Sequence, residues 1–205
     1  MFLNNIISLL ENEFFLMFIP TFDLLNNASH YKLKYSYPNL FQNADAYKIE
    51  VSTSNADGQF YKEQLNNNKI VILENDIGSF VFSNVFTFDI FQILQKHYKE
   101  YTNYVFCSDK DFGYFKILEN GKIKRKINSF GFIKGISIYP ETRGVPCQYE
   151  IDNNVTFKID SKAKLLVEML KGFGRKEVID LIDYYIGISR ISNGDINKTH
   201  FYEIR

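Results

Sequence analysis

The fold is decided by a stretch that reverses direction at its centre, YFKILENGKIKRKI at residues 114–127. Both flanks, Tyr114–Leu118 and Ile123–Ile127, have the composition and length of β-strands. Asn120-Gly121 between them is the strongest short hairpin signal, because a type I′ turn needs positive φ at both central positions. The sequence therefore predicts an antiparallel hairpin with its tip at Asn120-Gly121.

Further strands and helices are predicted on both sides of this hairpin. The strands are expected at Lys32–Tyr37, Tyr47–Ser52, Lys69–Glu74, Ser79–Phe82, Tyr104–Cys107, Gln148–Ile151 and Val155–Ile159. A helix capped by Thr87 or Asp89 precedes the hairpin, and two more are expected at Asp160–Lys171 and Arg175–Tyr185, the last ended by Gly187. Strands grouped together, with helices at the ends and one in the middle, indicate an α+β fold with a largely antiparallel sheet.

The N-terminal segment is rich in apolar residues, and we interpret residues 2–18 as an amphipathic helix packed on the domain. Glu11 and Glu13 interrupt the apolar stretch, and no Lys or Arg precedes it, which argues against a secretory signal. The run Phe14–Ile19 is far shorter than the roughly 20 residues that cross a bilayer. We therefore expect one cytoplasmic α+β domain over residues 1–205, with residues 1–30 as a helical arm.

The composition is balanced in charge and unusually rich in aromatic residues. The 205 residues include 20 Phe, 14 Tyr and no Trp, and 24 basic residues match 24 acidic ones. A net charge of zero argues against general nucleic-acid binding, which needs a basic excess. The aromatic residues reflect either an AT-rich coding genome or interface anchors. The basic run Lys122–Lys126 is interpreted as a solvated hairpin arm, because alternation along a strand divides its charges over two faces.

No motif for catalysis or metal binding is recognisable in the sequence. None of the three histidines has a second ligand at the spacing of a metal site, and neither a P-loop nor a nucleophile elbow occurs. Asp109 and Asp111 form a D-x-D pair without the later residues of a calcium loop. Cys107 and Cys147 are too few for a disulfide framework and lack zinc spacing, so reduced thiols are expected. We expect a protein without a cofactor that is not an enzyme.

A series of short motifs follows the central helix. They are Tyr104-Val105-Phe106, the acidic loop Asp109–Asp111, the aromatic strand Phe112–Lys116, Asn120-Gly121-Lys122 followed by Arg125, Gly144-Val145-Pro146 with Glu150, and the helical segment Lys176–Leu181. In this order, over about residues 85–189, they resemble a family of small bacterial immunity proteins found beside polymorphic toxins. The chain departs from the family in lacking its Trp and in the additional helix Asp160–Lys171, and residues 1–75 have no counterpart in the resemblance.

The resemblance implies a cytoplasmic protein that neutralises a cognate toxin by presenting a complementary surface. Its expected partner is a toxin domain, and neither nucleic acid nor a membrane. Asp109, Asp111, Phe112 and Tyr114 are candidate contact residues, because a loop between aromatic strands presents both charge and anchors. An ordinary strand-end loop is the alternative for these residues. Two other functions stay open: a metal-dependent enzyme using Asp109, Asp111 and Glu150, and a structural or inhibitory protein of a phage or mobile element.

Overall fold

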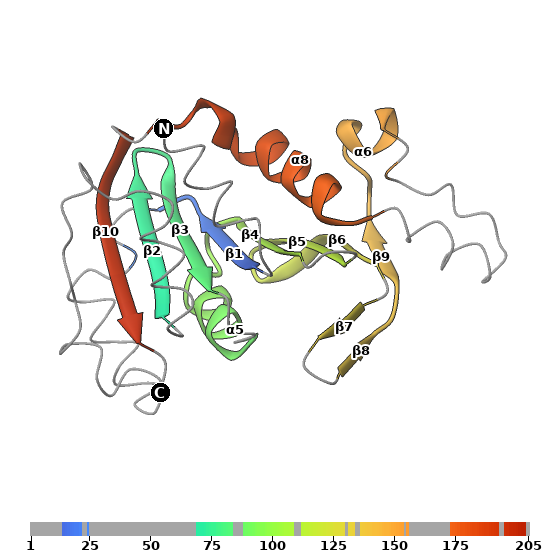
Figure 1. Cartoon of the computed structure of the whole chain (residues 1–205), viewed down its shortest axis with the longest axis horizontal. Coiled ribbons are helices and arrows are strands. Elements are labelled where there is room, and N and C mark those ends of the chain that lie inside the picture. Colours follow the sequence, from blue (N-terminus) through green and yellow to red (C-terminus); the bar gives the residue numbers. More distant parts are fainter. Residues whose placement is uncertain are drawn as a thin grey trace, which may run out of the picture.

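An eight-stranded antiparallel sheet forms the centre of the computed structural model, in the order β10-β2-β3-β1-β4-β5-β6-β9. The structure describes residues 14–21, 24, 69–83, 88–108, 112–129, 131–133, 136–153, 155, 173–192 and 195–203. The strands are β1 (Phe14–Ile19), β2 (Lys69–Asn75), β3 (Gly78–Ser83), β4 (Asn103–Ser108), β5 (Gly113–Glu119), β6 (Lys122–Asn128), β9 (Glu141–Gly144) and β10 (Ile196–Glu203). Helix α8 (Arg175–Ile186) covers one face and α5 (Phe88–His97) the other (Figure 1). The predicted α+β fold is confirmed.

The apolar run Phe14–Ile19 is a central strand of this sheet. All six side chains are buried. Phe14, Leu16 and Phe18 join the core on the α8 side, and the alternate residues Phe15, Met17 and Ile19 join the core on the α5 side. A strand covered on both faces is apolar throughout and so lacks the alternation of a half-exposed strand. The predicted helix over residues 2–18 is therefore wrong from Phe14 onward, and residues 2–13 lie outside the described part of the chain.

The predicted hairpin is confirmed. Asn120 and Gly121 have φ values of 50° and 73°, which are the positive angles that the turn requires. β5 and β6 pair in register from Tyr114↔Asn128 to Ile117↔Arg125, and the register then shifts, leaving Lys124 as an extra residue opposite the Ile117/Leu118 step. This bulge separates the exposed tip from a buried base that begins at Arg125.

Most of the other predicted elements in the described residues are confirmed. The helices at Phe88–His97 and Arg175–Ile186 form as expected, and Gly187 ends the second with a φ of 72°. The predicted strand Gln148–Ile151 is wrong, because these residues form the short helix α6 (Gln148–Asp152). A small hairpin, β7 (Gly131–Ile133) and β8 (Ile136–Ile138), connects β6 to β9, and the 3-10 turn η3 (Ile188–Arg190) follows α8.

Several predicted elements lie outside the described residues: the strands at 32–37 and 47–52, the strand beginning at Val155 apart from that residue, and the helix at 160–171. Within the described part of the chain, no helix has the length and apolar character needed to span a membrane.

Candidate functional site

The four residues predicted to contact a partner divide into two groups in the structure. Phe112 and Tyr114 are buried in the core between the sheet and α5. Asp109 and Asp111 lie outside the described residues. The binding loop therefore stays a prediction, but its two aromatic residues support the fold here and are not exposed anchors.

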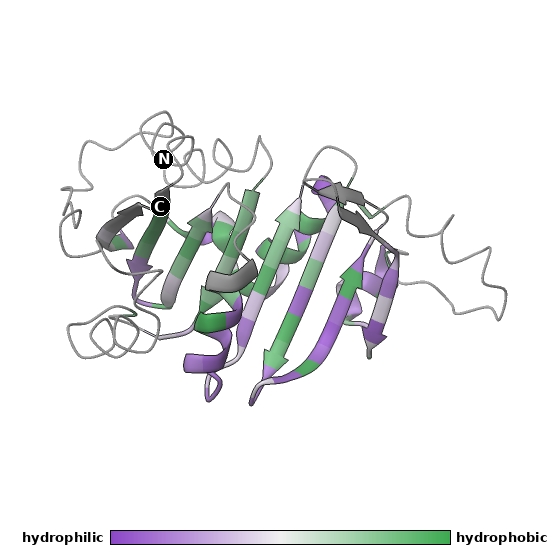
Figure 2. Cartoon of the chain, turned by 90° about the horizontal axis from the view of Figure 1, so that it is seen from below, coloured by the Kyte–Doolittle hydropathy of each residue, from purple (hydrophilic) through white to green (hydrophobic). Residues whose placement is uncertain are grey.

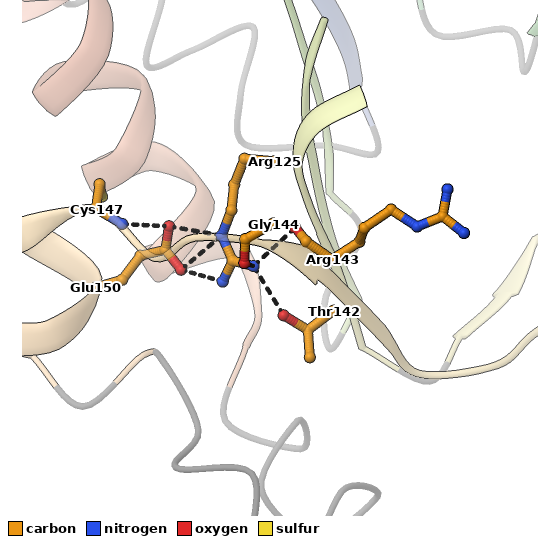
Figure 3. A network of polar contacts seen from close by, with 6 residues as sticks. All are labelled: Arg125, Thr142, Arg143, Gly144, Cys147 and Glu150. Carbon is orange, nitrogen blue, oxygen red and sulfur yellow. Dashed lines mark hydrogen bonds and ion pairs between the residues drawn. The ribbon is translucent and has the colours of Figure 1, made fainter. Parts of the chain in front are cut away.

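A buried network joins β6, β9 and α6 at one end of the sheet (Figure 3). The Arg125 guanidinium donates through Nε to both carboxylate oxygens of Glu150, at 3.0 and 3.1 Å, and through its NH2 group to Oε2. Its NH1 group donates to Thr142 Oγ1 at 2.9 Å and to the carbonyl oxygens of Arg143 and Gly144 at 2.9 and 3.1 Å. The side chains of Arg125 and Glu150 are only 3% and 0% exposed. The ion pair is thus enclosed by protein.

Glu150 also sets the start of α6. Its Oε1 accepts the backbone N–H of Cys147 at 3.2 Å, so the carboxylate caps the helix that carries it. The same carboxylate therefore joins a local helix cap to a contact 25 residues away in sequence. Together these bonds occupy the acceptor positions that the alternative metal cluster would need from Glu150.

Gly144 lets β9 approach β6 closely at this network. Its φ is +85°, and a Cβ added there would lie 1.9 Å from the carbonyl oxygen of Lys124. Only glycine fits such a position without moving the backbone. The close approach places the Gly144 carbonyl within reach of the Arg125 guanidinium.

Helix α6 is fixed to α8 by a second set of contacts. Tyr149 donates its hydroxyl to Asp180 Oδ2 at 2.8 Å, and Lys176 contacts the same oxygen at 2.6 Å. The rings of Tyr149 and Tyr184 lie 5.8 Å apart. Burial, followed by the hydrogen bond to Asp180, raises the pKa of Tyr149, so its hydroxyl remains a donor well above neutral pH. The short helix is therefore held from both sides, by Glu150 and by Tyr149.

Exposed apolar side chains lie on and beside this fixed helix. Val145, between β9 and α6, is 84% exposed; Ile151 on α6 is 53% and Tyr184 on α8 is 50% exposed. We call the segment from β9 through α6, with the facing part of α8, the β9–α6 corner. Arg125, Thr142 and Glu150 meet in the network, whereas Val145, Ile151 and Tyr184 are in solvent.

The sheet changes from apolar to polar toward this corner. Figure 2 shows hydrophobic colouring along the middle strands and mainly hydrophilic colouring on β6 and β9. In that view α5 lies over the middle strands, and no other described helix covers β5, β6 and β9 on this side. The corner therefore adjoins a polar surface of the sheet.

The cysteines and the acidic residues in the described part of the chain form no metal-binding cluster. Neither Cys107 nor Cys147 forms a disulfide, and burial raises the pKa of Cys147. Among the described residues, no group of three or more His, Cys, Asp or Glu side chains is arranged to hold a metal ion.

Sequence reasoning had singled out Arg125, Gly144, Val145 and Glu150 as motif residues, but it did not predict their contact. Thr142 and Tyr149 were missed, and nothing in their spacing would have indicated them. Asp180 lies within the motif segment Lys176–Leu181, but its contact with Tyr149 was not predicted. The sequence matches no protein-family model, and no curated protein and no solved structure is significantly similar to it.

Proposed function

We propose that this protein is an immunity-type binding protein that neutralises a cognate bacterial toxin in the cytoplasm by direct contact. The observation that carries the proposal is the convergence of motif residues from two distant segments. Arg125 from the hairpin meets Gly144 and Glu150 from the G-x-P segment in one buried network, which leaves Val145 in solvent. We propose the β9–α6 corner as the contact surface.

A rigid corner of this kind suits a protein that acts by tight binding. Association costs free energy when flexible segments become ordered, so a surface fixed beforehand retains more of its interaction energy. The network and the Tyr149 contact with Asp180 provide this fixation. Exposed side chains such as Val145 and Tyr184 then supply the apolar and aromatic contacts that dominate interfaces.

The test is co-expression with the toxin encoded next to this protein's gene. The wild-type protein is expected to restore growth and to co-purify with the toxin. Because a few free toxin molecules can kill, the expected dissociation constant is nanomolar or lower, about 12 kcal/mol of binding free energy. Failure of the wild-type protein to bind or to protect against any neighbouring toxin would refute the immunity function.

A matched pair of variants tests the surface separately. Val145→Asp places a charge on the corner, whereas Ile77→Asp makes the same kind of change at an exposed apolar residue in the β2–β3 turn. We expect Val145→Asp to weaken the complex at least tenfold, about 1.4 kcal/mol, and Ile77→Asp to leave the affinity unchanged. Equal affinities for both variants would show that the corner is not part of the interface, and toxin neutralisation would remain the proposed function.

A further inference from the structure

Three basic side chains lie side by side on the polar surface next to the corner. The strand register pairs Lys116 on β5 with Lys126 on β6, and Lys126 with Arg143 on β9. Directly paired residues project to the same face of a sheet, with Cβ atoms about 5 Å apart. Lys116, Lys126 and Arg143 therefore form one row across three strands, which we call the basic row. It lies on the sheet face that α5 covers farther along.

The side chains of the basic row are more buried on β5 and β6 than on the edge strand β9. Lys116 is half-buried beside α5, the Lys126 side chain is 20% exposed, and the Arg143 side chain at the edge strand is 63% exposed. The ring of Tyr114 lies beside the row, with Lys126 Nζ 5.9 Å from the centre of the ring. The row is thus accessible from the edge of the sheet and ends at a partly enclosed ammonium group.

The negative charge within the row does not match its positive charge. Lys126 and Arg143 share Glu141, which is bonded to Lys126 and lies 4.0 Å from Arg143 Nε. The Lys116 ammonium donates to the neutral Gln95 Oε1 at 3.0 Å, and within the described residues it forms no ion pair with a carboxylate. Burial, followed by the charge of Lys126, lowers the pKa of Lys116 to about 8. Among the described residues, three cations therefore face one carboxylate.

We propose that the basic row docks an acidic segment of a partner protein, with one of its carboxylates bound at Lys116. The proposal rests on the proposed function, because it names the chemistry of the partner's contacting segment. A carboxylate at Lys116 would offset the repulsion from Lys126 and accept charge-assisted hydrogen bonds in a partly desolvated place. Arg143, more exposed at the edge, would meet a second acidic group first and orient the segment.

The row fits an acidic peptide better than nucleic acid. Nucleic-acid backbones need an extended basic track that neutralises many phosphates. Here the row holds three cations, Glu141 lies among them, and the chain as a whole has no excess of positive charge. A short segment bearing two or three carboxylates matches both the length and the charge of the row.

Two charge-matched triple variants of the full chain provide the test. The row variant carries Lys116→Gln, Lys126→Gln and Arg143→Gln. The control variant carries Lys96→Gln, Lys99→Gln and Lys122→Gln, which removes the same charge at exposed lysines outside the row. The probe is a fluorescein-labelled peptide of ten glutamates, measured by fluorescence anisotropy at low salt beside a labelled ten-nucleotide thymidine strand.

We expect the wild-type protein to bind the glutamate peptide more tightly than the thymidine strand. The row variant should bind the peptide at least tenfold more weakly, and the control variant less than threefold more weakly. In wild-type protein the peptide should also raise the pKa of Lys116, followed by NMR of its side-chain ammonium. If circular dichroism shows that the row variant does not fold, the pKa of Lys116 in the wild-type protein and the peptide affinity of the single variant Arg143→Gln test the docking proposal instead.

Three results would overturn the proposal: equal weakening by both triple variants, tighter binding of the thymidine strand, or no binding of the peptide by the wild-type protein. Each leaves toxin neutralisation intact, since that function is measured by growth and co-purification. Conversely, peptide binding at the row without toxin protection would keep the docking surface and reject the proposed function.

Discussion

The Arg125–Glu150 ion pair gives the most direct test of how the β9–α6 corner is held. Both side chains are enclosed, and Arg125 also satisfies two backbone carbonyls of β9. Glu150→Leu would leave the guanidinium buried without its counter-ion, and Arg125→Met would leave the carboxylate in the same state. Breaking a buried pair in this way costs about 3–5 kcal/mol. That is a large share of the roughly 5–15 kcal/mol that stabilises a typical protein.

The double variant separates the loss of stability caused by an unpaired buried charge from the loss caused by missing hydrogen bonds. With Arg125→Met and Glu150→Leu together, no unpaired charge remains, and the loss reduces to unsatisfied partners such as the Gly144 carbonyl and the Cys147 N–H. Both groups are only partly buried, so each costs less than the roughly 1–3 kcal/mol of a fully buried group without a partner. We therefore expect the double variant to lose less stability than the sum of the single variants, with a coupling free energy of about 2 kcal/mol or more.

Urea unfolding followed by circular dichroism measures these losses. The control is Lys124→Gln, which breaks the exposed ion pair between Lys124 on β6 and Glu119 on β5 and should cost less than about 1 kcal/mol. The reasoning fails if either single variant loses no more than this control, or if the effects of the two single variants are additive.

Three further predictions concern other parts of the molecule. Gly144→Ala should destabilise the protein by about 2 kcal/mol or more, because the left-handed backbone alone costs about 1–2 kcal/mol and the added Cβ would clash with the backbone of β6. Gly187→Ala should cost less in the same urea assay, because the atom nearest to its added Cβ would be 3.8 Å away. Burial lowers the pKa of Lys116 from its ordinary 10.5 to about 8, so the unfolded chain binds more protons than the folded chain between these pH values. The free energy of unfolding of the wild-type protein should therefore rise with pH across that window, relative to that of Lys116→Met. The same pH dependence in both proteins would contradict the lowered pKa. Maleimide labelling of the native protein, read by mass spectrometry, should modify Cys147 before the buried Cys107, and the reverse order would be inconsistent with the structure.

The fold could be predicted from sequence wherever the deciding signal is local. Asn120-Gly121 sets its own backbone angles, and the pattern of Arg175–Ile186 with Gly187 after it identifies a helix without reference to other segments. Phe14–Ile19 was misassigned because its fully apolar pattern comes from burial by two layers, which depends on the rest of the fold. Gln148–Ile151 was misassigned as a strand because the helix that these residues begin has a cap stabilised by Arg125, 25 residues from Glu150.

The candidate sites depend even more on contacts between distant segments. The basic run Lys122–Lys126 was predicted to be a solvated arm, yet the structure divides it: Lys122 and Lys124 are exposed, and Arg125 is buried. Which of these side chains faces which way depends on the bulge at Lys124, and no sequence rule places that extra residue. Arg143 joins the row only because β9 pairs with β6 in one particular register. Composition identified the charges but not their arrangement.

The two proposed surfaces differ in how salt should affect them, because the β9–α6 corner is held by an enclosed ion pair, whereas the basic row is open to solvent at Arg143. The Debye length falls to about 3 Å at 1 M salt, which screens exposed groups such as Arg143 but acts weakly on the enclosed Arg125–Glu150 pair. High salt should therefore weaken docking at the basic row while the β9–α6 corner keeps its shape and its apolar contacts through Val145. If a toxin uses both surfaces, its affinity should fall with added salt and then level off. The row variant should already have the lower, salt-insensitive affinity, whereas Val145→Asp should weaken binding at every salt concentration.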